Sequence, residues 1–400
     1  MTVPSARRNQ LVTVAMVFSV FTGFAFVLPF LPLFVRELGV EEPERAALWA
    51  GVLIGVSPLL AGLLAPFWGR LADRQGHKGV AVTALAAYVV LLALSAAVTR
   101  VEQLLLLRVG IGLFGGIGPL GLAMATVQAP RGETGRAVGL IQAAQILSAA
   151  MGPFAGGLLA DAIGTRRTFL VTSALSAFAL ALVLAFYQER GRGEARASEP
   201  LPGLGAIVAL PGVAALLVVL FLVNFIGRSF TPILPLHLES LGVEPGRLAS
   251  ATGVLISTYS AAAAASAWYL GRLSRDRSPV GLLLLTLVGG AVLVAPMALV
   301  PRFGLILGLA VLLGLVSGGS LTLCYTIGGL MVPATVRTTA FGFFSGAALF
   351  GGAISPPLAG LVAHISLRGI YWVDAALYLA LAVALARASA LRALSPPAPA

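Results

Sequence analysis

Two arginines stand inside long apolar stretches, where a charge is costly. Arg108 lies in "LLLLRVGIGLFG" and Arg228 lies in "FLVNFIGRSF". A guanidinium stays protonated and presents five hydrogen-bond donors, which suits it to bind carboxylates, phosphates and carbonyl oxygens. A charged side chain within such a stretch usually faces a polar interior and marks a ligand or ion pathway. We therefore expect both arginines to contact a bound molecule or the ion coupled to it.

Uncharged polar residues inside the same kind of stretch supply further candidate contacts. Asn224 lies one helical turn before Arg228, so the two side chains share a face. Gln142 and Gln145 share a face of another stretch, and Tyr259 and Tyr325 lie in two more. We expect these residues to line a cavity together with the arginines.

Acidic residues have the opposite distribution. All 15 Asp and Glu residues fall in loops or near the ends of apolar stretches, and Asp161, Glu239 and Asp374 come nearest to the interior. Two cations therefore enter the interior without an acid to neutralise them. This imbalance predicts a cavity that favours anionic or neutral amphiphilic molecules over lipophilic cations. The alternative is that both arginines bind carbonyl oxygens and polar groups and leave the cavity neutral.

The composition sets the class of protein that positions these residues. Hydrophobic residues make up 58% of the 400 residues, mean hydropathy is +0.98, and only 10% of residues are charged. A soluble domain could not bury so much apolar surface, so the chain must be solvated by lipid. The net charge of +11 comes from scattered arginines without a basic face, which argues against nucleic-acid binding. The lone Cys324 excludes an intrachain disulfide, and we find no metal-binding or catalytic cluster.

The apolar stretches predict an all-α membrane protein with twelve transmembrane helices, since about 20 apolar residues cross a bilayer. We place them near residues 11–35, 46–68, 79–99, 103–127, 137–160, 166–187, 208–236, 249–270, 279–300, 303–330, 338–364 and 369–388. With both termini in the cytoplasm, 16 of the 26 basic residues fall inside, eight fall outside and two lie within spans. The excess of positive charge inside supports this orientation.

An internal repeat divides the chain into two halves. "LPLFVRELGVEEPER" at 31–45 matches "LPLHLESLGVEPGR" at 234–247, and "GRLADR" at 69–74 matches "GRLSRDR" at 271–277, with shifts of 203 and 202 residues. We therefore predict a six-helix bundle over residues 1–187, a cytoplasmic linker over 188–206, and a second six-helix bundle with a short tail over 207–400. Two such repeats are the architecture of transporters that alternate around a central site.

Three motifs resemble signatures of the major facilitator superfamily. "GRLADRQGHK" at 69–78 is similar to its loop signature through Gly69, Leu71, Asp73, Arg74, Gly76 and Lys78, although His77 replaces the usual arginine. "RVGIG" at 108–112 resembles a second signature. "GLIQAAQILSAAMGPFAGG" at 139–157 resembles the signature of the drug/proton antiporter branch through Gly139, Gly152, Pro153, Gly156 and Gly157, with Ser148 in place of a glycine.

The resemblance implies specific roles for these residues. It implies a latch between Asp73 and the start of the eleventh span near Thr338, made when the cytoplasmic side is closed. A carboxylate at a helix N-terminus gains about 0.3–1 kcal/mol. The alternative is that Asp73 only keeps the loop hydrated. Pro153 and the glycines around it should give a close interface between the halves, because absent side chains let helices approach, unless they form only a passive packing groove.

The expected function is a secondary active exporter of the multidrug type without a cofactor, acting as a monomer in the plasma (inner) membrane. Proton coupling is implied by the resemblance alone, and Asp73, Asp161, Asp374 and His237 are the candidate titrating groups. The same fold and arginines would also serve an importer or exchanger of a small organic anion. A membrane enzyme is a third possibility, but the three histidines lie far apart and no nucleophile motif is present.

Overall fold

The computed structural model is all-helical in the part of the chain that it describes, residues 3–128, 134–189, 205, 208–333 and 336–387. The helices are α1 Val3–Val27, η1 Leu28–Phe30, α2 Leu31–Glu37, α3 Pro43–Gln75, α4 His77–Ser95, α5 Val101–Leu113, α6 Ile117–Gln128, α7 Thr134–Ile163, α8 Thr165–Phe186, α10 Val213–Ser229, α11 Leu234–Ser240, η2 Pro245–Arg247, α12 Leu248–Leu273, α13 Pro279–Val294, η3 Ala295–Ala298, α14 Phe303–Ser317, α15 Ser320–Met331, α16 Arg337–Ile365 and α17 Gly369–Arg387.

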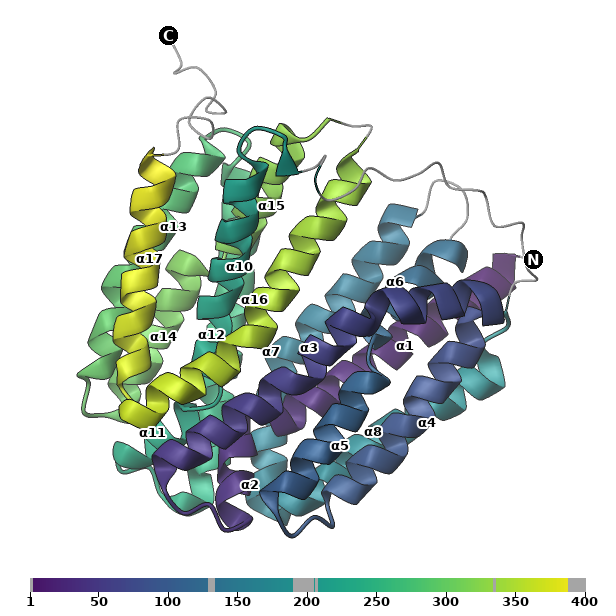
Figure 1. Ribbon diagram of the computed structural model, residues 1–400, viewed down its shortest axis with the longest axis horizontal. Coiled ribbons are helices and arrows are strands. Elements are labelled where there is room, and N and C mark those ends of the chain that lie inside the picture. The colour runs from purple at the N-terminus through teal and green to yellow at the C-terminus, as the bar shows by residue number, and fades with distance from the viewer. Residues whose placement is uncertain (1–2, 129–133, 190–204, 206–207, 334–335, 388–400) are drawn as a thin grey trace.

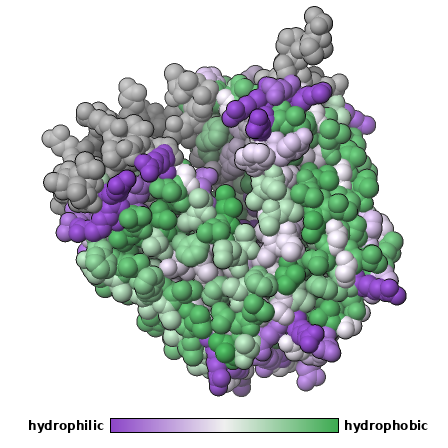
Figure 2. All heavy atoms as spheres, turned by 180° about the vertical axis from the view of Figure 1, so that it is seen from behind, coloured by the Kyte–Doolittle hydropathy of each residue, from purple (hydrophilic) through white to green (hydrophobic). Residues whose placement is uncertain are grey.

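The predicted twelve spans are confirmed. Eleven helical stretches of the described chain are long and apolar enough to cross a membrane, and the pair α10 and α11, bent by 43°, makes the twelfth. Large apolar side chains such as Leu106, Trp268 and Leu285 are about 70% exposed. Figure 2 shows a broad hydrophobic belt with hydrophilic residues gathered toward its two ends. This surface suits a bilayer, which solvates the belt with lipid.

Breaks in the helices recur at equivalent places of the repeat. Pro29 and Pro32 lie where α1 passes through η1 into α2, and Pro232 and Pro235 lie where α10 gives way to α11. Proline lacks the N–H that an uninterrupted helix needs, so the chain bends there. The span formed by α5 and α6 breaks at residues 114–116, and the span formed by α14 and α15 breaks at residues 318–319.

Helices α1–α8 and α10–α17 form two groups that meet mainly through two helix pairs, α3 with α16 and α7 with α12. Figure 1 shows the groups joined at the end where α2 and α11 lie, while their other ends, toward the two termini, stand apart. The joined end is glycine-rich. A Cβ on Gly51 would lie 2.2 Å from the carbonyl oxygen of Pro356, and one on Gly253 would lie 2.2 Å from that of Pro153. Only glycine permits such backbone contact.

Candidate functional site

A cavity of about 140 Å³ lies inside the second group of helices. It brings together three residues predicted from sequence, Asn224 and Arg228 of α10 and Tyr259 of α12. Its full lining is Val223, Asn224, Gly227, Arg228, Tyr259, Ser317, Gly318, Leu321 and Tyr378. Asn224 and Arg228 share a face because they are four residues apart on one helix. The cavity therefore combines one cation with amide, phenol and hydroxyl groups, as a binding site for a small polar or amphiphilic molecule would.

The break between α14 and α15 shapes one wall of this cavity. At the break, Gly318 packs so closely on α12 that a Cβ would lie 2.3 Å from the Cα of Ala263. The backbone turn leaves Ser317 and Leu321 facing the cavity on either side. The glycine is thus needed for the close approach that places Tyr259 beside the break.

Buried polar groups lie directly behind the cavity wall. Asp374 of α17 is fully buried, and its Oδ2 is hydrogen-bonded to Ser229 Oγ at 2.5 Å. His237 of α11, also fully buried, has its Nδ1 2.7 Å from the hydroxyl of Tyr371. Within the described residues, Asp374 Oδ1 and His237 Nε2 have no hydrogen-bond partner. The Asp374 carboxyl and the His237 imidazole thus each make a hydrogen bond through one polar atom and none, within the described residues, through the other.

Asp374 corrects the expectation that no acid enters the interior. It lies five residues beyond the first residue of α17, and α10 covers it through Ser229. Its closeness to the end of the span made it look like a loop-facing residue in the sequence. The bend between α10 and α11 folds chain over that end of the helix and buries the carboxyl.

Arg108 of α5 does not share the cavity with Arg228. Its side chain is 1% exposed, its Nε and Nη2 have no partner among the described residues, and it does not line the cavity. Its backbone carbonyl accepts a hydrogen bond from Ser57 of α3 at 2.6 Å. Arg228, by contrast, is exposed toward the cavity. Arg108 is thus packed into the interior of the first group, and a central cavity shared by both arginines stays a prediction, because the cavity beside Arg228 lies within the second group.

Three other predicted wall residues also lie elsewhere. Gln142 is exposed, and Gln145 faces Gly118 of α6. The Tyr325 hydroxyl lies 3.4 Å from Ser345 Oγ. None of these predicted residues lines the cavity. Helical spacing identified polar faces correctly, but which neighbouring helix each face meets depends on the packing of the bundle.

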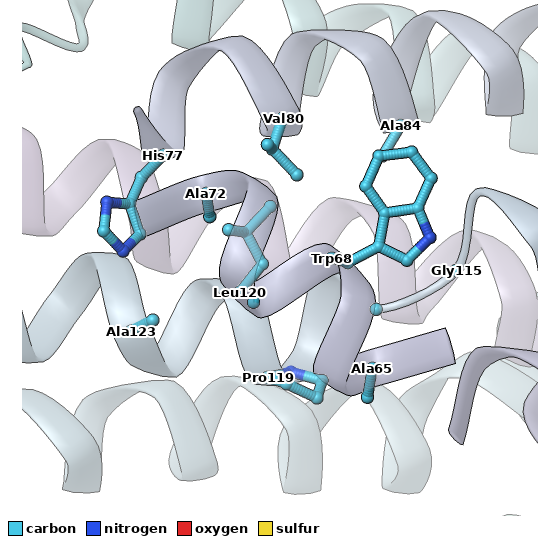
Figure 3. A pocket seen from close by; sticks show the side chains of 12 residues that line it. Ala65, Trp68, Ala72, His77, Val80, Ala84, Gly115, Pro119, Leu120 and Ala123 are labelled. Carbon is cyan, nitrogen blue, oxygen red and sulfur yellow. The ribbon is translucent and has the colours of Figure 1, made fainter. Parts of the chain in front are cut away.

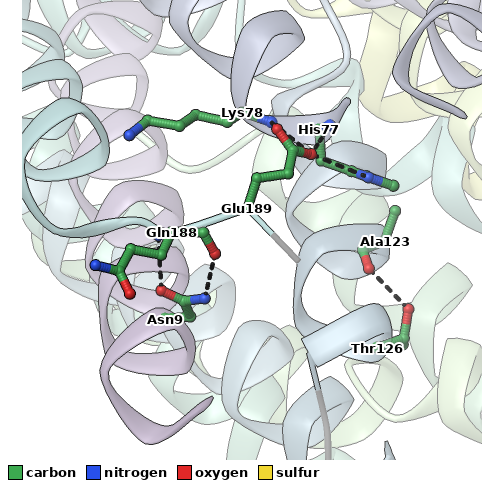
Figure 4. Close-up of polar contacts among 7 residues, drawn as sticks. All are labelled: Asn9, His77, Lys78, Ala123, Thr126, Gln188 and Glu189. Atoms are coloured by element: carbon green, nitrogen blue, oxygen red, sulfur yellow. Dashed lines mark hydrogen bonds and ion pairs between the residues drawn. The ribbon is translucent and has the colours of Figure 1, made fainter. Parts of the chain in front are cut away.

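The "GRLADRQGHK" segment joins α3 to α4 and binds the chain that follows α8 (Figure 4). Gly76 has φ +100°, and the carboxylate of Glu189 occupies the space that a Cβ would need. Glu189 accepts hydrogen bonds from the backbone N–H groups of His77 and Lys78, at the start of α4, where the helix dipole favours a carboxylate. Lys78 Nζ donates to the carbonyl oxygens of Leu184 and Tyr187. The loop thus clamps the end of α8.

The start of the predicted linker is held to the first group as well. Asn9 Nδ2 donates to the carbonyl oxygen of Gln188 at 2.7 Å, and the Gln188 N–H donates to Asn9 Oδ1 at 3.0 Å. Residues 190–204 and 206 of that linker lie outside the described residues. The same holds for the side chains of Asp73 and Thr338, so the expected latch stays a prediction. A Cβ added at Gly69 would have no heavy atom within 4 Å, and the Arg74 side chain is exposed.

The antiporter-type motif on α7 serves two interfaces. Gly157 meets Ala249 of α12 in the other group, where a Cβ would lie 2.4 Å from a backbone oxygen. Gly152 and Gly156 instead pack on Ala25 and Phe26 of α1, within the same group. The prediction of an interface between the halves is thus wrong for these two glycines, because they face a different side of α7. The carbonyl oxygen of Pro153 contacts α12. A Cβ added at Gly139 would have no heavy atom within 4 Å.

A second cavity, of about 120 Å³, lies within the first group between α3, α4 and α6 (Figure 3). Its walls are mainly apolar, with Ala72, Val80 and Leu120 among them. His77 and Trp68 supply its ring nitrogens, and the indole N–H of Trp68 donates to the Leu113 carbonyl oxygen. This cavity offers less polar chemistry than the one beside Arg228.

Sequence reasoning missed Ser317 and Tyr378 as lining residues. It named Asp374 and His237 only as candidate titrating groups and did not single out Ser229 or Tyr371. A usable signal existed for α17, where Tyr371, Asp374 and Tyr378 recur at spacings of three and four residues. Such spacing places all three on one helical face. A polar stripe on an otherwise apolar helix indicates a face turned away from lipid.

Comparisons with known proteins agree with this architecture. The sequence profile of the Major Facilitator Superfamily matches residues 13–301 and, again, 249–399. The chain is 33% identical to the multidrug resistance protein MdtG of Dickeya zeae over 77% of this chain and 76% of that protein. It is 30% identical to the protein of the same name from Escherichia fergusonii, over 93% of this chain and 92% of that protein.

Solved structures share the fold at low sequence identity. A bacterial homologue of the human lysosomal transporter Spinster, in an inward-facing and occupied conformation, has a TM-score of 0.79 at 16% identity, covering 98% of this chain and 97% of that one. The nucleoside transporter NupG has a TM-score of 0.71 at 15% identity, covering 94% and 98%. The chain therefore belongs to the major facilitator superfamily and is a multi-pass membrane transporter rather than an enzyme.

Proposed function

We propose that this protein is a multidrug-type efflux transporter of small amphiphilic compounds, driven by protons through alternating access. The observation that carries the proposal is the polar cavity around Arg228 in a chain whose relatives are named multidrug resistance proteins. The cavity supplies a binding site inside one helical bundle. The protein would act as a monomer in the inner membrane.

Alternating access is supported by how the two groups meet. The glycine crossings hold them together at one end, and their other ends stand apart (Figure 1). With both termini in the cytoplasm, as the basic residues favour, the separated ends face the cytoplasm. Substrate would then enter from the cytoplasm in this conformation and leave after the groups rock about the cavity.

The charge of the cavity favours anionic or neutral substrates. Arg228 is the cation exposed toward the cavity, and no Asp or Glu is among the lining residues. A lipophilic cation entering there would meet an uncompensated like charge, which disfavours it. An anion or a neutral molecule with hydrogen-bond acceptors would instead pair with the guanidinium and the neighbouring amide.

Everted membrane vesicles test the direction and the driving force. We expect vesicles with an acidic lumen to accumulate chloramphenicol, a neutral amphiphile, and to lose it when the gradient is collapsed. Absence of accumulation, together with uptake of fluorescein by whole cells, would favour the anion importer that the same fold allows.

Arg228→Ala tests the charge preference, with the exposed loop variant Arg302→Ala as the matched control. We expect Arg228→Ala to weaken fluorescein transport and to leave or improve transport of the cation ethidium. Arg302→Ala should resemble the parent protein for every probe. Selective loss of ethidium transport in Arg228→Ala would contradict the proposed preference.

A further inference from the structure

We infer that Asp374 is the residue that carries the coupling proton, and that it is protonated and occluded in this conformation. This inference rests on the proposed proton-driven function and names the group that would perform the coupling. Asp374 is the fully buried acid among the described residues, and one turn further along α17 Tyr378 reaches the cavity. A proton bound to Asp374 would thus lie behind the cavity wall, one helical turn of α17 from a residue that lines the cavity.

The hydrogen count around Ser229 supports a protonated carboxyl. Ser229 Oγ lies 2.8 Å from the carbonyl oxygen of Ile226 and 2.5 Å from Asp374 Oδ2. A serine hydroxyl has one hydrogen to donate, and a carbonyl oxygen has none. Each contact has its own hydrogen only when Ser229 donates to Ile226 and Asp374 donates to Ser229. The arrangement therefore matches a carboxylic acid better than a carboxylate.

The surroundings of Asp374 point the same way. Its Oδ1 has no hydrogen-bond partner within the described residues, which costs much more for a carboxylate than for a neutral acid. Helices α13 and η3, which pack on α17, bring no titratable side chain, and His364 of α16 is exposed. The groups that do face this region are Arg228 of α10, Tyr259 of α12, His237 of α11, Arg368 before α17, and Tyr371 and Tyr378 on α17 itself.

The first half of the chain shows that the fold does not require an acid here. Thr172 of α8 lies 202 residues before Asp374, and Gly23 of α1 lies 203 residues before Ile226. Thr172 donates a hydrogen bond to the Gly23 carbonyl oxygen at 3.1 Å. The equivalent place is thus filled by a threonine that packs and bonds without titrating. This difference makes Asp374→Thr a variant that the architecture already accommodates.

The position also restricts which substrates can exchange for the proton. Arg228 and Tyr378 line the same cavity, and Asp374 lies one turn before Tyr378 on α17, so the guanidinium and the acid lie near the same cavity wall. An anion bound to Arg228 would favour the protonated acid, because losing the proton adds a second negative charge nearby. Proton and anion would then move together. Exchange in opposite directions therefore suits neutral substrates in particular.

The decisive test uses the purified full-length protein in liposomes with radiolabelled chloramphenicol. The variants are Asp374→Thr and Asp374→Asn, and Glu102→Gln, an exposed acid at the start of α5, is the control. Two assays run in parallel, uptake driven by an acidic lumen and exchange of labelled for unlabelled substrate without a gradient. We expect both Asp374 variants to lose gradient-driven uptake, to keep exchange, and to show exchange that no longer changes with pH.

Each outcome is informative. Gradient-driven uptake in Asp374→Thr would overturn the inference and leave the proposed function intact. Loss of both assays in folded, monodisperse Asp374→Thr and Asp374→Asn would also overturn it, since the residue would then serve transport in general. If the parent protein shows no gradient-driven uptake of chloramphenicol but does show exchange, the proposed proton coupling fails, and the inference fails with it.

Ser229 supplies a second test that does not remove the acid. Ser229→Ala deletes the acceptor that holds the Asp374 proton, and Ser229→Thr keeps a hydroxyl. We expect Ser229→Ala to move the pH dependence of exchange toward lower pH, because the protonated acid loses a hydrogen bond, and Ser229→Thr to restore it. An unchanged pH profile in Ser229→Ala would contradict the proposed bond.

Discussion

The two halves keep the same helix crossings but fill their interiors with different groups. Gly51 on Pro356 and Gly253 on Pro153 are equivalent contacts of the repeat, and both place a built Cβ 2.2 Å from a carbonyl oxygen. The same holds further along for Gly157 on Ala249 and Gly360 on Ala47. Backbone contact leaves no room for divergence, because any side chain larger than hydrogen forces the helices apart.

The interiors diverge at equivalent places. The first half packs Phe34 against Phe169 with ring centroids 5.0 Å apart, where the second half packs His237 against Tyr371 at 5.2 Å. One turn further, Thr172 in the first half corresponds to Asp374 in the second. Helix packing accepts either set because the shapes are similar. The second half thus has titratable residues beside its cavity at positions where the first half has Phe and Thr, although the helix crossings are the same.

Arg108 reverses this pattern, and replacing it should give the largest effect on stability. Its repeat equivalent is Ala310, which is also buried, so the second half packs without a cation there. Arg108→Met keeps much of the volume and removes a buried charge whose Nε and Nη2 have no partner among the described residues. We expect the free energy of unfolding to rise by about 1–4 kcal/mol. Thermal unfolding in detergent would measure it, with exposed Arg302→Met as control; a loss of stability would show that the charge is compensated.

Gly51 and Gly253, the glycines at the two helix crossings, should respond equally to substitution if the two crossings are equivalent. We expect Gly51→Ala and Gly253→Ala each to cost about 1–3 kcal/mol at the joined end, through overpacking against a carbonyl oxygen. Gly62→Ala, on α3 with nothing within 4 Å, should have little effect.

Spin labels at positions 45 and 368, in a background where Cys324 is replaced by Ser, would report whether the joined end opens. We expect the distance between the labels to lengthen in both crossing variants and to stay unchanged in Gly62→Ala. A large difference between Gly51→Ala and Gly253→Ala would break the symmetry argument.

The sequence was sufficient for the features that depend on local pattern. Apolar length predicted twelve spans, since about 20 apolar residues are needed to cross a bilayer. Asn224, Arg228 and Tyr259, which line one cavity, could be singled out in the sequence because polar residues are rarely left facing lipid. These inferences need only the helix itself.

The rest depended on which helices meet. Arg108 and Arg228 look alike in the sequence, but one is packed inside a bundle and the other lines a cavity. Asp374 looked like an end residue until the bend after α10 covered it. Gly152 and Gly157 belong to one motif but face different helices. Contacts between distant segments set these outcomes, and no single helix encodes them.

Converting the polar layer of the second half into that of the first should have a moderate effect. His237→Phe alone leaves the Tyr371 hydroxyl without its bond, whereas the double variant with Tyr371→Phe removes both partners and recreates the Phe34–Phe169 pair. We expect the double variant to exceed His237→Phe in unfolding free energy by about 0.5–1.5 kcal/mol. Chemical denaturation would measure it. Equal stability would mean that burying the Tyr371 hydroxyl without a partner costs nothing.

The smallest effect is expected where equivalent positions of the repeat carry opposite charges. Arg36 of α2 and Glu239 of α11 are 203 residues apart in sequence and form an ion pair across the joined end, with both side chains 32% exposed. A half-exposed pair of this kind contributes only about 0–1 kcal/mol.

Reversing the charges tests whether the two positions are equivalent. Arg36→Glu and Glu239→Arg should each lengthen the distance between the labels at positions 45 and 368. The double reversal should restore that distance, because the repeat places the two positions in matching surroundings. Breaking Arg247–Glu244, an ion pair within the second half, should leave the label distance unchanged. If the double reversal does not restore the label distance, the two positions are not interchangeable, and the two halves are alike in their backbone structure only.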